Sequence, residues 1–333
     1  MTQPLVRFNH FSLSFASEQG RVRAVQDLSF EVRGGQTVGI VGESGCGKSV
    51  TAMSLMGLLP PRSASIDGGE ILFQGRDVLT LRGRERAALR GNQMAMIFQE
   101  PMTALNPVLT IGEQLVEPLI LHRGESPKKA WALGTEMLTS VGLARAESLM
   151  SSYPHQLSGG MLQRVMIAMA LSCQPALLIA DEPTTALDVT VQAQILRLLR
   201  EQAQRHAMAL MLITHDLGVI AQMTERVVVM YAGRIVEQGT TAEVLRNPLH
   251  PYTQGLIAAK PQPGERRRRL YSIPGQVPDL AALPPYCAFY ARCERATERC
   301  RAGVPPLIGD ERQVACFWSG PAALAAGATH VSD

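Results

Sequence analysis

The 333-residue sequence contains no run of about 18 apolar residues, which is the length that a helix needs to cross a bilayer. Residues 1–10 lack the basic and then apolar layout of a secretory signal. No internal repeat is visible. Its 32 basic and 29 acidic residues give a net charge of only +3, so composition offers no argument for nucleic-acid binding. We therefore expect a chain without a membrane span, which could reach a membrane only through a partner.

A hydrophobic content of 46% is typical of a packed globular protein, and the length suits one large α/β domain with a smaller appendage. Short apolar segments without two-residue alternation occur at residues 38–41, 94–98, 177–180 and 210–213. Such segments are typical of parallel strands that are covered by helices on both faces. Each is followed at once by polar residues or glycine, at the sheet edge where α/β proteins bind ligands.

The remaining chain divides near residue 240. Residues 128–141 and 161–171 have helical patterns, and residues 227–231 and 234–237 predict a hairpin. Beyond residue 240 prolines multiply, and an arginine run follows at residues 266–269, which we interpret as a solvated loop or, alternatively, a contact with lipid headgroups or a partner. Residues 320–333 are small and polar, and we expect them to fray.

A phosphate-binding loop is predicted directly after the segment at residues 38–41. Its glycines allow backbone N–H groups to turn toward phosphate oxygens, Lys48 can reach the terminal phosphates, and the Ser49 hydroxyl can join a Mg²⁺ shell. The helix expected to follow adds its positive dipole end. The alternative is a glycine-rich turn with an incidental lysine. We interpret Cys46 as a space-filling residue. The loop consists of Gly42, Glu43, Ser44, Gly45, Cys46, Gly47, Lys48 and Ser49.

Four further polar residues follow strand ends. Asp181 can hold Mg²⁺, while Glu182, which points elsewhere, can face the water that attacks the γ-phosphate. Gln99 can ligate Mg²⁺ and orient water, and His215 can donate to the γ-phosphate. Each has an ordinary alternative: an acidic pair that caps a helix, a surface glutamine, and a hydrogen-bonded loop histidine.

In this order, these motifs resemble the nucleotide-binding subunit of ABC transporters. The most specific element is the sequence Leu157, Ser158, Gly159, Gly160 and Met161, about 20 residues before Asp181. At a helix N-terminus it forms an anion site. In the family, it completes the ATP pocket of the opposite subunit, so the resemblance implies that two chains enclose two nucleotides. The alternative is that Ser158 merely caps its helix. Methionine replaces the commoner glutamine at position 161, as in the branch that serves peptide importers.

The resemblance covers about residues 5–240 and implies a P-loop NTPase (RecA-like) α/β core. An antiparallel β subdomain and a helical subdomain at about residues 101–171 complete the expected nucleotide-binding domain, residues 1–240. It assigns catalysis to Glu182, His215 and Gln99, Mg²⁺ binding to Ser49, Gln99 and Asp181, and the dimer interface to Asp188 in the loop 186–188. Phe15 matches the aromatic residue that stacks on adenine, although a strand phenylalanine is often core. The expected ATP-binding residues are Phe15, Gly42, Glu43, Ser44, Gly45, Cys46, Gly47, Lys48, Ser49 and Val50.

The C-terminal segment, residues 241–333, carries a second resemblance. Residues 247–253 and 273–278 are similar to the extension of oligopeptide and dipeptide importer ATPases; sister systems for nickel or glutathione use similar chains. Some members carry a 4Fe–4S cluster there. Four thiols could hold such a cluster or Zn²⁺, or stay free, and their gaps of five, six and fifteen residues lack the Cys-x-x-Cys spacing typical of zinc. They are Cys287, Cys293, Cys300 and Cys316.

The resemblance implies an ATPase that energises peptide import from the cytoplasmic face of the bacterial inner membrane. The expected partners are a second ABC ATPase, favoured as a sister chain, two transmembrane permease subunits and an extracytoplasmic substrate-binding protein, with no nucleic acid. One alternative is a soluble ABC protein that acts on ribosomes or DNA, but such proteins commonly carry two ATPase halves or zinc modules within the core. Another is a metal-responsive regulator that uses ATP only as a ligand, against which Glu182 and His215 argue. The substrate itself is not encoded in this chain.

Overall fold

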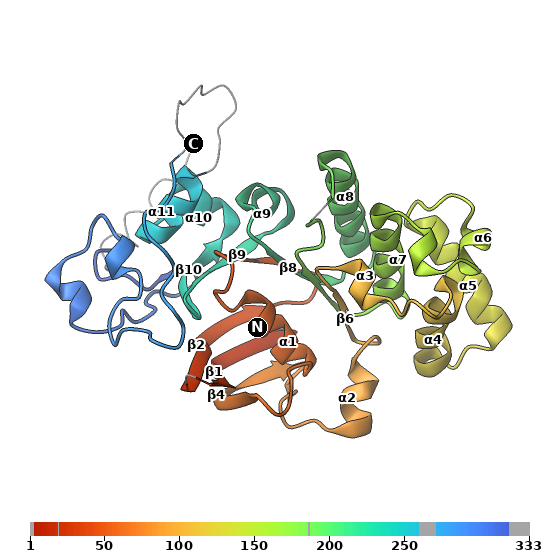
Figure 1. The fold of residues 1–333 in the computed structure, drawn as a ribbon, viewed down its shortest axis with the longest axis horizontal. Helices are drawn as coiled ribbons and strands as arrows, with labels where there is room; N and C mark the ends of the chain where they lie inside the picture. Colours follow the sequence, from red (N-terminus) through yellow and green to blue (C-terminus); the bar gives the residue numbers. More distant parts are fainter. Residues whose placement is uncertain (1–2, 19, 186, 260–270, 320–333) are drawn as a thin grey trace. The chain divides into compact units, whose positions relative to one another are not determined.

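A computed structural model describes residues 3–18, 20–185, 187–259 and 271–319 of the chain (Figure 1). The described residues form two compact units, each built from separate stretches of sequence. The helical unit comprises Met1–Leu5, Val32–Gln36 and Asp77–Ile213, and the phosphate-loop unit comprises Val6–Glu31, Thr37–Arg76 and Thr214–Asp333. Residues on both sides of position 240 belong to the phosphate-loop unit, and the predicted domain boundary there stays a prediction.

Three parallel strands pair with one another in the helical unit. β6 (Met94–Ile97) pairs with β7 (Leu177–Asp181), which pairs with β8 (Ala209–Thr214). Every residue of these strands is buried, which explains why the sequence lacks two-residue alternation there. The structure thus confirms three of the predicted parallel strands. The helices of this unit are α2 (Gly83–Leu89), α3 (Pro101–Ala104), α4 (Ile111–Arg123), α5 (Pro127–Ser140), α6 (Ala146–Met150), α7 (Gly159–Leu171) and α8 (Val189–Arg205), with a 3₁₀ turn at Pro154–Gln156.

Helices α4 to α7 pack together at the right of Figure 1. Ile111, Leu115 and Leu119 follow one another at four-residue spacing on α4, and all are fully buried. Thr110 and Glu113 form a reciprocal capping box that satisfies free N–H groups at the start of α4. The predicted helices at residues 128–141 and 161–171 are confirmed as α5 and α7.

Two sheets form the phosphate-loop unit. The first has the order β2-β1-β4-β5 and pairs β1 with β4 antiparallel (Val6 opposite Phe73). In the second, β3 runs parallel to β9, and β9 and β10 form the predicted hairpin. The strands of the phosphate-loop unit are β1 (Val6–Ser17), β2 (Gly20–Val32), β3 (Thr37–Val41), β4 (Ala64–Phe73), β5 (Arg76–Asp77), β9 (Arg226–Tyr231), β10 (Arg234–Thr240) and β11 (Gln313–Val314). The helices of this unit are α1 (Lys48–Met56), α9 (Leu217–Met223), α10 (Thr241–Arg246) and α11 (Pro251–Ala258), with 3₁₀ turns at Tyr290–Arg292 and Glu298–Arg301.

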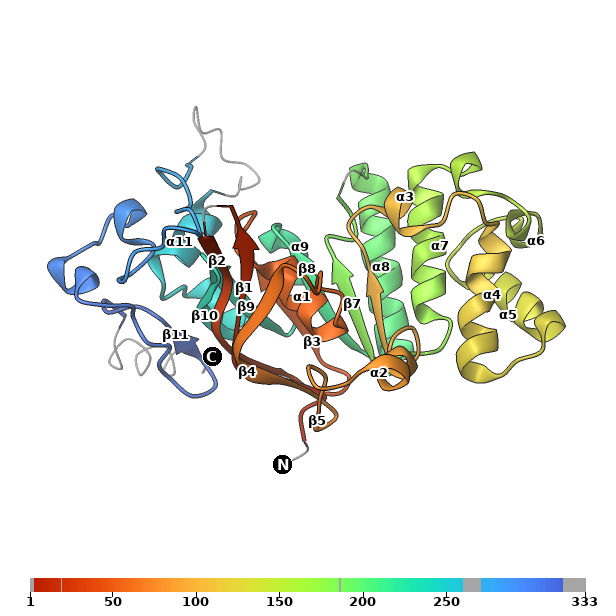
Figure 2. The same ribbon diagram turned by 60° about the horizontal axis from the view of Figure 1, so that its bottom comes forward.

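Residues from 241 onward are hereafter called the C-terminal extension. Its described residues include α10 and α11 and lie beside β10 (Figures 1 and 2). Three aromatic rings join the extension to strand β9. The ring centroids of Tyr231 and Tyr252 are 4.7 Å apart, and Phe289 lies 5.2 Å from Tyr231 and 5.5 Å from Tyr252. All three side chains are buried, so part of the core of this unit is made by the extension. The arginine run at residues 266–269 and the tail at 320–333 lie outside the described residues.

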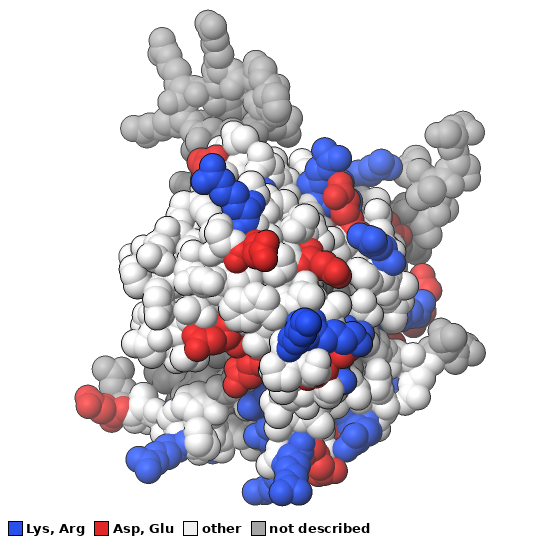
Figure 3. Space-filling view, turned by 90° about the vertical axis from the view of Figure 1, so that its right-hand side faces the viewer, with Lys and Arg blue, Asp and Glu red and all other residues white. Residues whose placement is uncertain are grey.

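Within the described part of the chain, no helix combines the length and the apolar character needed to cross a membrane. The face shown in Figure 3 carries basic and acidic side chains interspersed among uncharged ones. This mixture agrees with the small net charge of +3.

Candidate nucleotide-binding site

The predicted phosphate loop connects β3 to α1, as the sequence predicts. Two of its glycines stand where no other residue fits. A Cβ atom on Gly42 would come within 2.2 Å of the Met230 carbonyl oxygen, and one on Gly47 within 2.6 Å of that of Ala24. Gly47 also has a φ of 99°, which side chains rarely allow. The loop is therefore held closely against neighbouring backbone, as a cradle of N–H groups requires.

Lys48 and Cys46 pack inside this loop. The Lys48 ammonium donates hydrogen bonds to the carbonyl oxygens of Gly42 at 2.8 Å and Glu43 at 3.0 Å. Burial raises the pKa of the Cys46 thiol, although nearby Lys48 acts in the opposite direction. Since Cys46 is 1% exposed and keeps its proton, its environment fits the space-filling interpretation.

Glu43 is held by two residues of the C-terminal extension. The guanidinium of Arg292 donates to both carboxylate oxygens of Glu43, through Nη1 at 2.6 Å and Nη2 at 2.9 Å. The backbone N–H of Glu43 donates to the hydroxyl of Tyr252 at 2.8 Å. Neither partner was predicted from the sequence. Tyr252 lies in the 247–253 segment of the resemblance, whereas Arg292 is 249 positions from Glu43 and carries no motif of its own.

The predicted acidic residues lie at one edge of the sheet in the helical unit. Asp181 ends β7 and is 5% exposed. Glu182 follows with a φ of 46°, and its N–H donates to the Ile213 carbonyl at 2.9 Å. Thr185 Oγ1 donates to the Glu182 carboxylate at 2.8 Å. Because β6 and β7 are parallel neighbours, the exposed Gln99, two residues beyond β6, follows the strand end next to Asp181.

Two predicted interface residues begin helices in the same unit. Ser158 caps α7, where its side chain accepts a hydrogen bond from the Met161 N–H at 3.4 Å. Asp188 caps α8 in the same way, accepting from Val191 at 2.9 Å. The exposed Gly159 and the half-buried Gly160 follow Ser158 in the first turn of α7, where free N–H groups are available to an anion. Ala186, in the predicted interface loop, lies outside the described residues.

The two remaining predicted residues belong to the phosphate-loop unit, as do Lys48, Ser49 and Val50. His215 is exposed directly after β8, and Phe15 is half-buried in β1, opposite Ala64 of β4. Gln99, Asp181 and Glu182 belong to the helical unit. Convergence of the two groups on one triphosphate stays a prediction, as do the individual roles.

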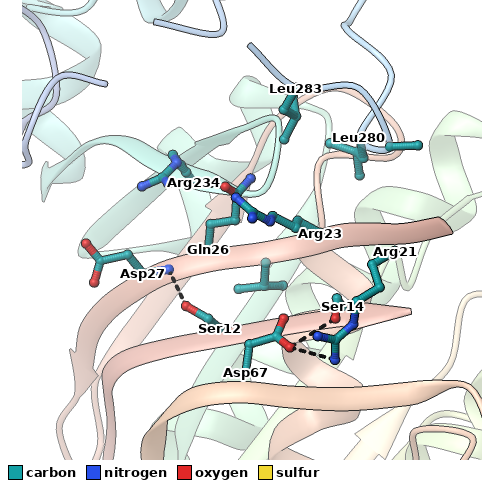
Figure 4. Close-up of a pocket in the computed structure, with 12 residues that line it drawn as sticks. Ser12, Ser14, Arg21, Arg23, Gln26, Asp27, Asp67, Arg234, Leu280 and Leu283 are labelled. Carbon is teal, nitrogen blue, oxygen red and sulfur yellow. Dashed lines mark hydrogen bonds and ion pairs between the residues drawn. The ribbon is translucent and has the colours of Figure 1, made fainter. Parts of the chain in front are cut away.

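A separate polar cavity of about 720 Å³ opens on the strands of the phosphate-loop unit (Figure 4). Arg21 pairs with Asp67 at 3.1 Å, and Ser14 donates to the same carboxylate. Leu280 and Leu283 of the extension line the cavity on another side. The described residues that line it include none of the phosphate loop, so this cavity is not the predicted nucleotide site.

The predicted metal site at the four cysteines is not supported by the placement of the residues. Among the described residues, no group of three or more His, Cys, Asp or Glu side chains is arranged to hold a metal ion. The four thiols, which form no disulfide, do line one small cavity together. Burial raises the pKa of Cys287 to about 11 and also raises that of Cys293. As placed, these two thiols are protonated.

Comparison with protein families agrees with this geometry. Residues 25–185 match the model described as "ABC transporter", and residues 236–300 match the "Oligopeptide/dipeptide transporter, C-terminal region". The oligopeptide transport ATP-binding protein OppD of Salmonella typhimurium is 50% identical over 94% of this chain and 93% of its own length. The dipeptide transport ATP-binding protein DppD of Bacillus subtilis is 47% identical over 95% of both chains.

The fold is also that of solved ABC cassettes. The dimeric structure of MJ0796, described as a bacterial ABC transporter cassette, matches with a TM-score of 0.64 and 27% identity, covering 71% of this chain and 98% of that one. The chain is therefore an ABC ATPase. More narrowly, it belongs to the family of ATP-binding subunits of ABC-type oligopeptide and dipeptide importers.

Proposed function

We propose that this chain binds and hydrolyses ATP to energise the import of di- or oligopeptides through a membrane transporter. The observation that carries the proposal is the phosphate loop between β3 and α1. Its backbone is closely packed at Gly42 and Gly47, and the Lys48 ammonium lies across it. Peptide as the cargo is supported by the transporter-specific C-terminal region and by relatives named for oligopeptide and dipeptide transport.

In the proposed reaction, the loop N–H groups and Lys48 bind the phosphates, while Ser49, Gln99 and Asp181 hold Mg²⁺. Glu182 orients and deprotonates the attacking water, and His215 donates to the γ-phosphate. Phe15 stacks on adenine. Catalysis on this view is positioning and charge stabilisation, with no covalent bond to the protein. The φ of 46° at Glu182 and its bond from Thr185 support a carboxylate held in one direction.

The proposed assembly is a pair of ATPase chains bound to two permease subunits at the cytoplasmic face of the inner membrane, with an external substrate-binding protein. Ser158, Gly159, Gly160 and Met161 of one chain would cover the nucleotide of the other, with Asp188 at the interface. Support comes from the position of these residues at the start of α7, because the first N–H groups of a helix have no partner within the helix. A sister chain is the proposed second ATPase.

Glu182→Gln tests the proposal in the assembled transporter, with Glu201→Gln on the exposed face of α8 as the matched control. We expect Glu182→Gln to lower ATP turnover by at least about 100-fold while ATP stays bound, because a general base commonly contributes 10²–10⁴-fold. The control should hydrolyse ATP like the wild type. Turnover of Glu182→Gln within about threefold of wild type would remove Glu182 from the reaction.

A separate and finer proposal concerns the four cysteines. We propose that they hold a 4Fe–4S cluster, with Zn²⁺ as the alternative, that stabilises the extension and takes no part in ATP hydrolysis. The shared cavity supports this, as do backbone N–H groups of Phe289 and Arg295 that donate to the sulfurs of Cys287 and Cys293. Since the sulfurs as placed form no metal group, binding would require them to move together.

Iron and zinc content of anaerobically purified protein, read together with its visible absorption, tests this cluster. Cys293→Ser should lose the iron and the brown colour, whereas Cys173→Ser, a buried cysteine of the helical unit, should keep both. A colourless wild type with one zinc per chain would reject the cluster in favour of zinc.

A further inference from the structure

The phosphate loop contains an acidic residue, Glu43, whose charge has the same sign as that of the phosphates the loop is proposed to bind. The loop is proposed to bind a triphosphate, yet Glu43 brings a negative charge to its second position. A bare carboxylate within a few ångströms of a phosphate would oppose binding, since like charges at about 4 Å repel by about 1 kcal/mol even in bulk water and by more near a protein surface. In the structure, the carboxylate of Glu43 is paired with the guanidinium of Arg292.

Arg292 of the extension pairs with that carboxylate in the strongest geometry available to an arginine. Both carboxylate oxygens are engaged, at 2.6 Å and 2.9 Å, which is the bidentate arrangement. The side chain of Arg292 is 4% exposed and that of Glu43 is 29% exposed. Because the arginine is buried, dissolved salt weakens this ion pair less than it would weaken an exposed pair. The pKa of Arg292 is raised, chiefly by its hydrogen bonds to Glu43.

The guanidinium is itself fixed by the extension and by β9. Its Nε donates to the Pro274 carbonyl at 2.9 Å, and Nη1 donates to the Tyr231 hydroxyl at 3.4 Å. The guanidinium carbon also lies 5.8 Å from the centre of the Tyr231 ring and 5.9 Å from that of Phe289. Because every nitrogen of the guanidinium is engaged, Arg292 is a rigid part of the extension and not a mobile surface side chain.

A second contact fixes the backbone of the same loop residue. The Tyr252 hydroxyl accepts the Glu43 N–H, and the Tyr252 ring is fully buried. Burial raises the pKa of Tyr252, so the hydroxyl stays neutral. The extension thus holds Glu43 at both its side chain and its backbone, while the neighbouring Lys48 remains tied to the Gly42 and Glu43 carbonyls.

We infer that the C-terminal extension sets the nucleotide affinity of the phosphate loop through Arg292, which neutralises Glu43 and fixes the loop in its binding shape. Arg292 is a positioning residue in this role, since it acts on the nucleotide through Glu43. The extension is therefore part of the ATP site as well as a family-specific appendage. This inference rests on the proposed nucleotide site.

The test is a double-mutant cycle on the full chain, with a fluorescent ATP analogue as the ligand in binding titrations. We expect Arg292→Met to weaken binding about tenfold or more, which corresponds to about 1.4 kcal/mol. Glu43→Gln/Arg292→Met, in which the unpaired carboxylate is also removed, should recover affinity to within about threefold of wild type. A role for Arg292 only in packing would not be rescued in this way, because Glu43→Gln restores none of the guanidinium's contacts with Pro274, Tyr231 and Phe289.

Two further variants keep the outcomes separate. Arg301→Met is the matched control, since that arginine is exposed and lies over the ring of Tyr290; it should bind the analogue like wild type. If Arg292→Met fails to fold, Arg292→Lys takes its place, because lysine retains the charge without the bidentate geometry. Arg292→Lys should bind the analogue less tightly than wild type. Glu43→Gln/Arg292→Lys should bind it more tightly than Arg292→Lys alone.

The inference is overturned if Arg292→Met, or the lysine variant in its place, binds within twofold of wild type. It is equally overturned if adding Glu43→Gln leaves affinity as weak as in the arginine variant alone. Failure of the proposed site has a different signature. There the wild type and Lys48→Ala would bind the analogue equally, whatever residue stands at position 292.

Discussion

The carboxylate of Glu237 in β10 is fully buried and accepts a hydrogen bond from Arg312 Nη2, 3.1 Å away. The same carboxylate accepts the backbone N–H groups of Leu249 and His250 at 2.9 Å each, directly before α11. One acidic side chain thus joins the last strand of the hairpin to two distant parts of the extension. A buried charge of this kind is tolerated only when its hydrogen bonds are satisfied.

Arg312→Met should lower the free energy of unfolding by about 3 kcal/mol, because it leaves the Glu237 carboxylate buried without its cation. Denaturant titration of the full chain measures the change. Arg197→Met is the control, since its ion pair with Glu201 is exposed and should contribute nothing measurable. Glu237→Gln/Arg312→Met should be more stable than Arg312→Met alone, and equal stability would contradict the pairing.

Alanine at two glycines of the phosphate loop should have unequal effects. Gly45 has a φ of 78°, and no atom lies within 4 Å of where an alanine Cβ would stand, so Gly45→Ala should cost only the backbone strain, about 1–2 kcal/mol. Gly47→Ala adds a 2.6 Å approach to the Ala24 oxygen and should cost clearly more. Urea unfolding midpoints of the two variants provide the comparison. Equal losses of stability in the two variants would contradict the close packing of Gly47 against Ala24 of β2.

His250 should make the fold sensitive to acid. Burial lowers its pKa from 6.5 to about 3, so the unfolded chain takes up this proton first as the pH falls. Stability from His250 is complete above about pH 6.5 and decreases as the pH drops toward about 3, by about 2 kcal/mol at pH 5. His250→Asn, which can still accept the Tyr252 N–H, should lack this component.

Unfolding free energies at pH 7.5 and pH 5 measure the effect as a difference between the two proteins. Glu237 and the nearby Cys287 are present in both proteins, so neither contributes to the difference. The same pH dependence in wild type and His250→Asn would show that His250 does not titrate as its burial implies.

Cys46 should resist alkylation in the native protein. Its raised pKa and 1% exposure keep the thiol protonated and inaccessible, so reaction with iodoacetamide at pH 8 should be at least tenfold slower than in urea. Mass spectrometry of the peptide that contains Cys46 measures the rate. Native-state labelling as fast as in the denatured chain would contradict the packing of the loop around Lys48.

Local patterns predicted the elements well. The uniformly apolar segment at residues 177–180 became β7 because a strand buried on both faces needs no polar side, and the hairpin at Ala232 and Gly233 followed from its turn residues. Ser158 was expected at the start of a helix and is there. These features depend on neighbours within a few residues, which a sequence displays directly.

Other features depend on contacts between distant residues. Glu182 has a left-handed φ, and its N–H donates a hydrogen bond to the carbonyl oxygen of Ile213 on the adjacent strand. The residue type of Glu182 does not predict this conformation. The four cysteines were expected to form a metal group, but their spacing alone did not determine how the sulfurs are placed. The partners of Glu43 were missed for the same reason.

By itself, the sequence determined the class of the protein, the strand–loop–helix order of the phosphate loop and the residues that follow each strand. Periodicity and residue chemistry are properties of short stretches, and they persist whatever surrounds them. Only the tertiary structure decided that Arg292 and Tyr252 would meet Glu43, and that Glu237 would anchor the extension. Those contacts arise because burial brings together groups that are far apart along the chain, and a buried charge must then find a partner.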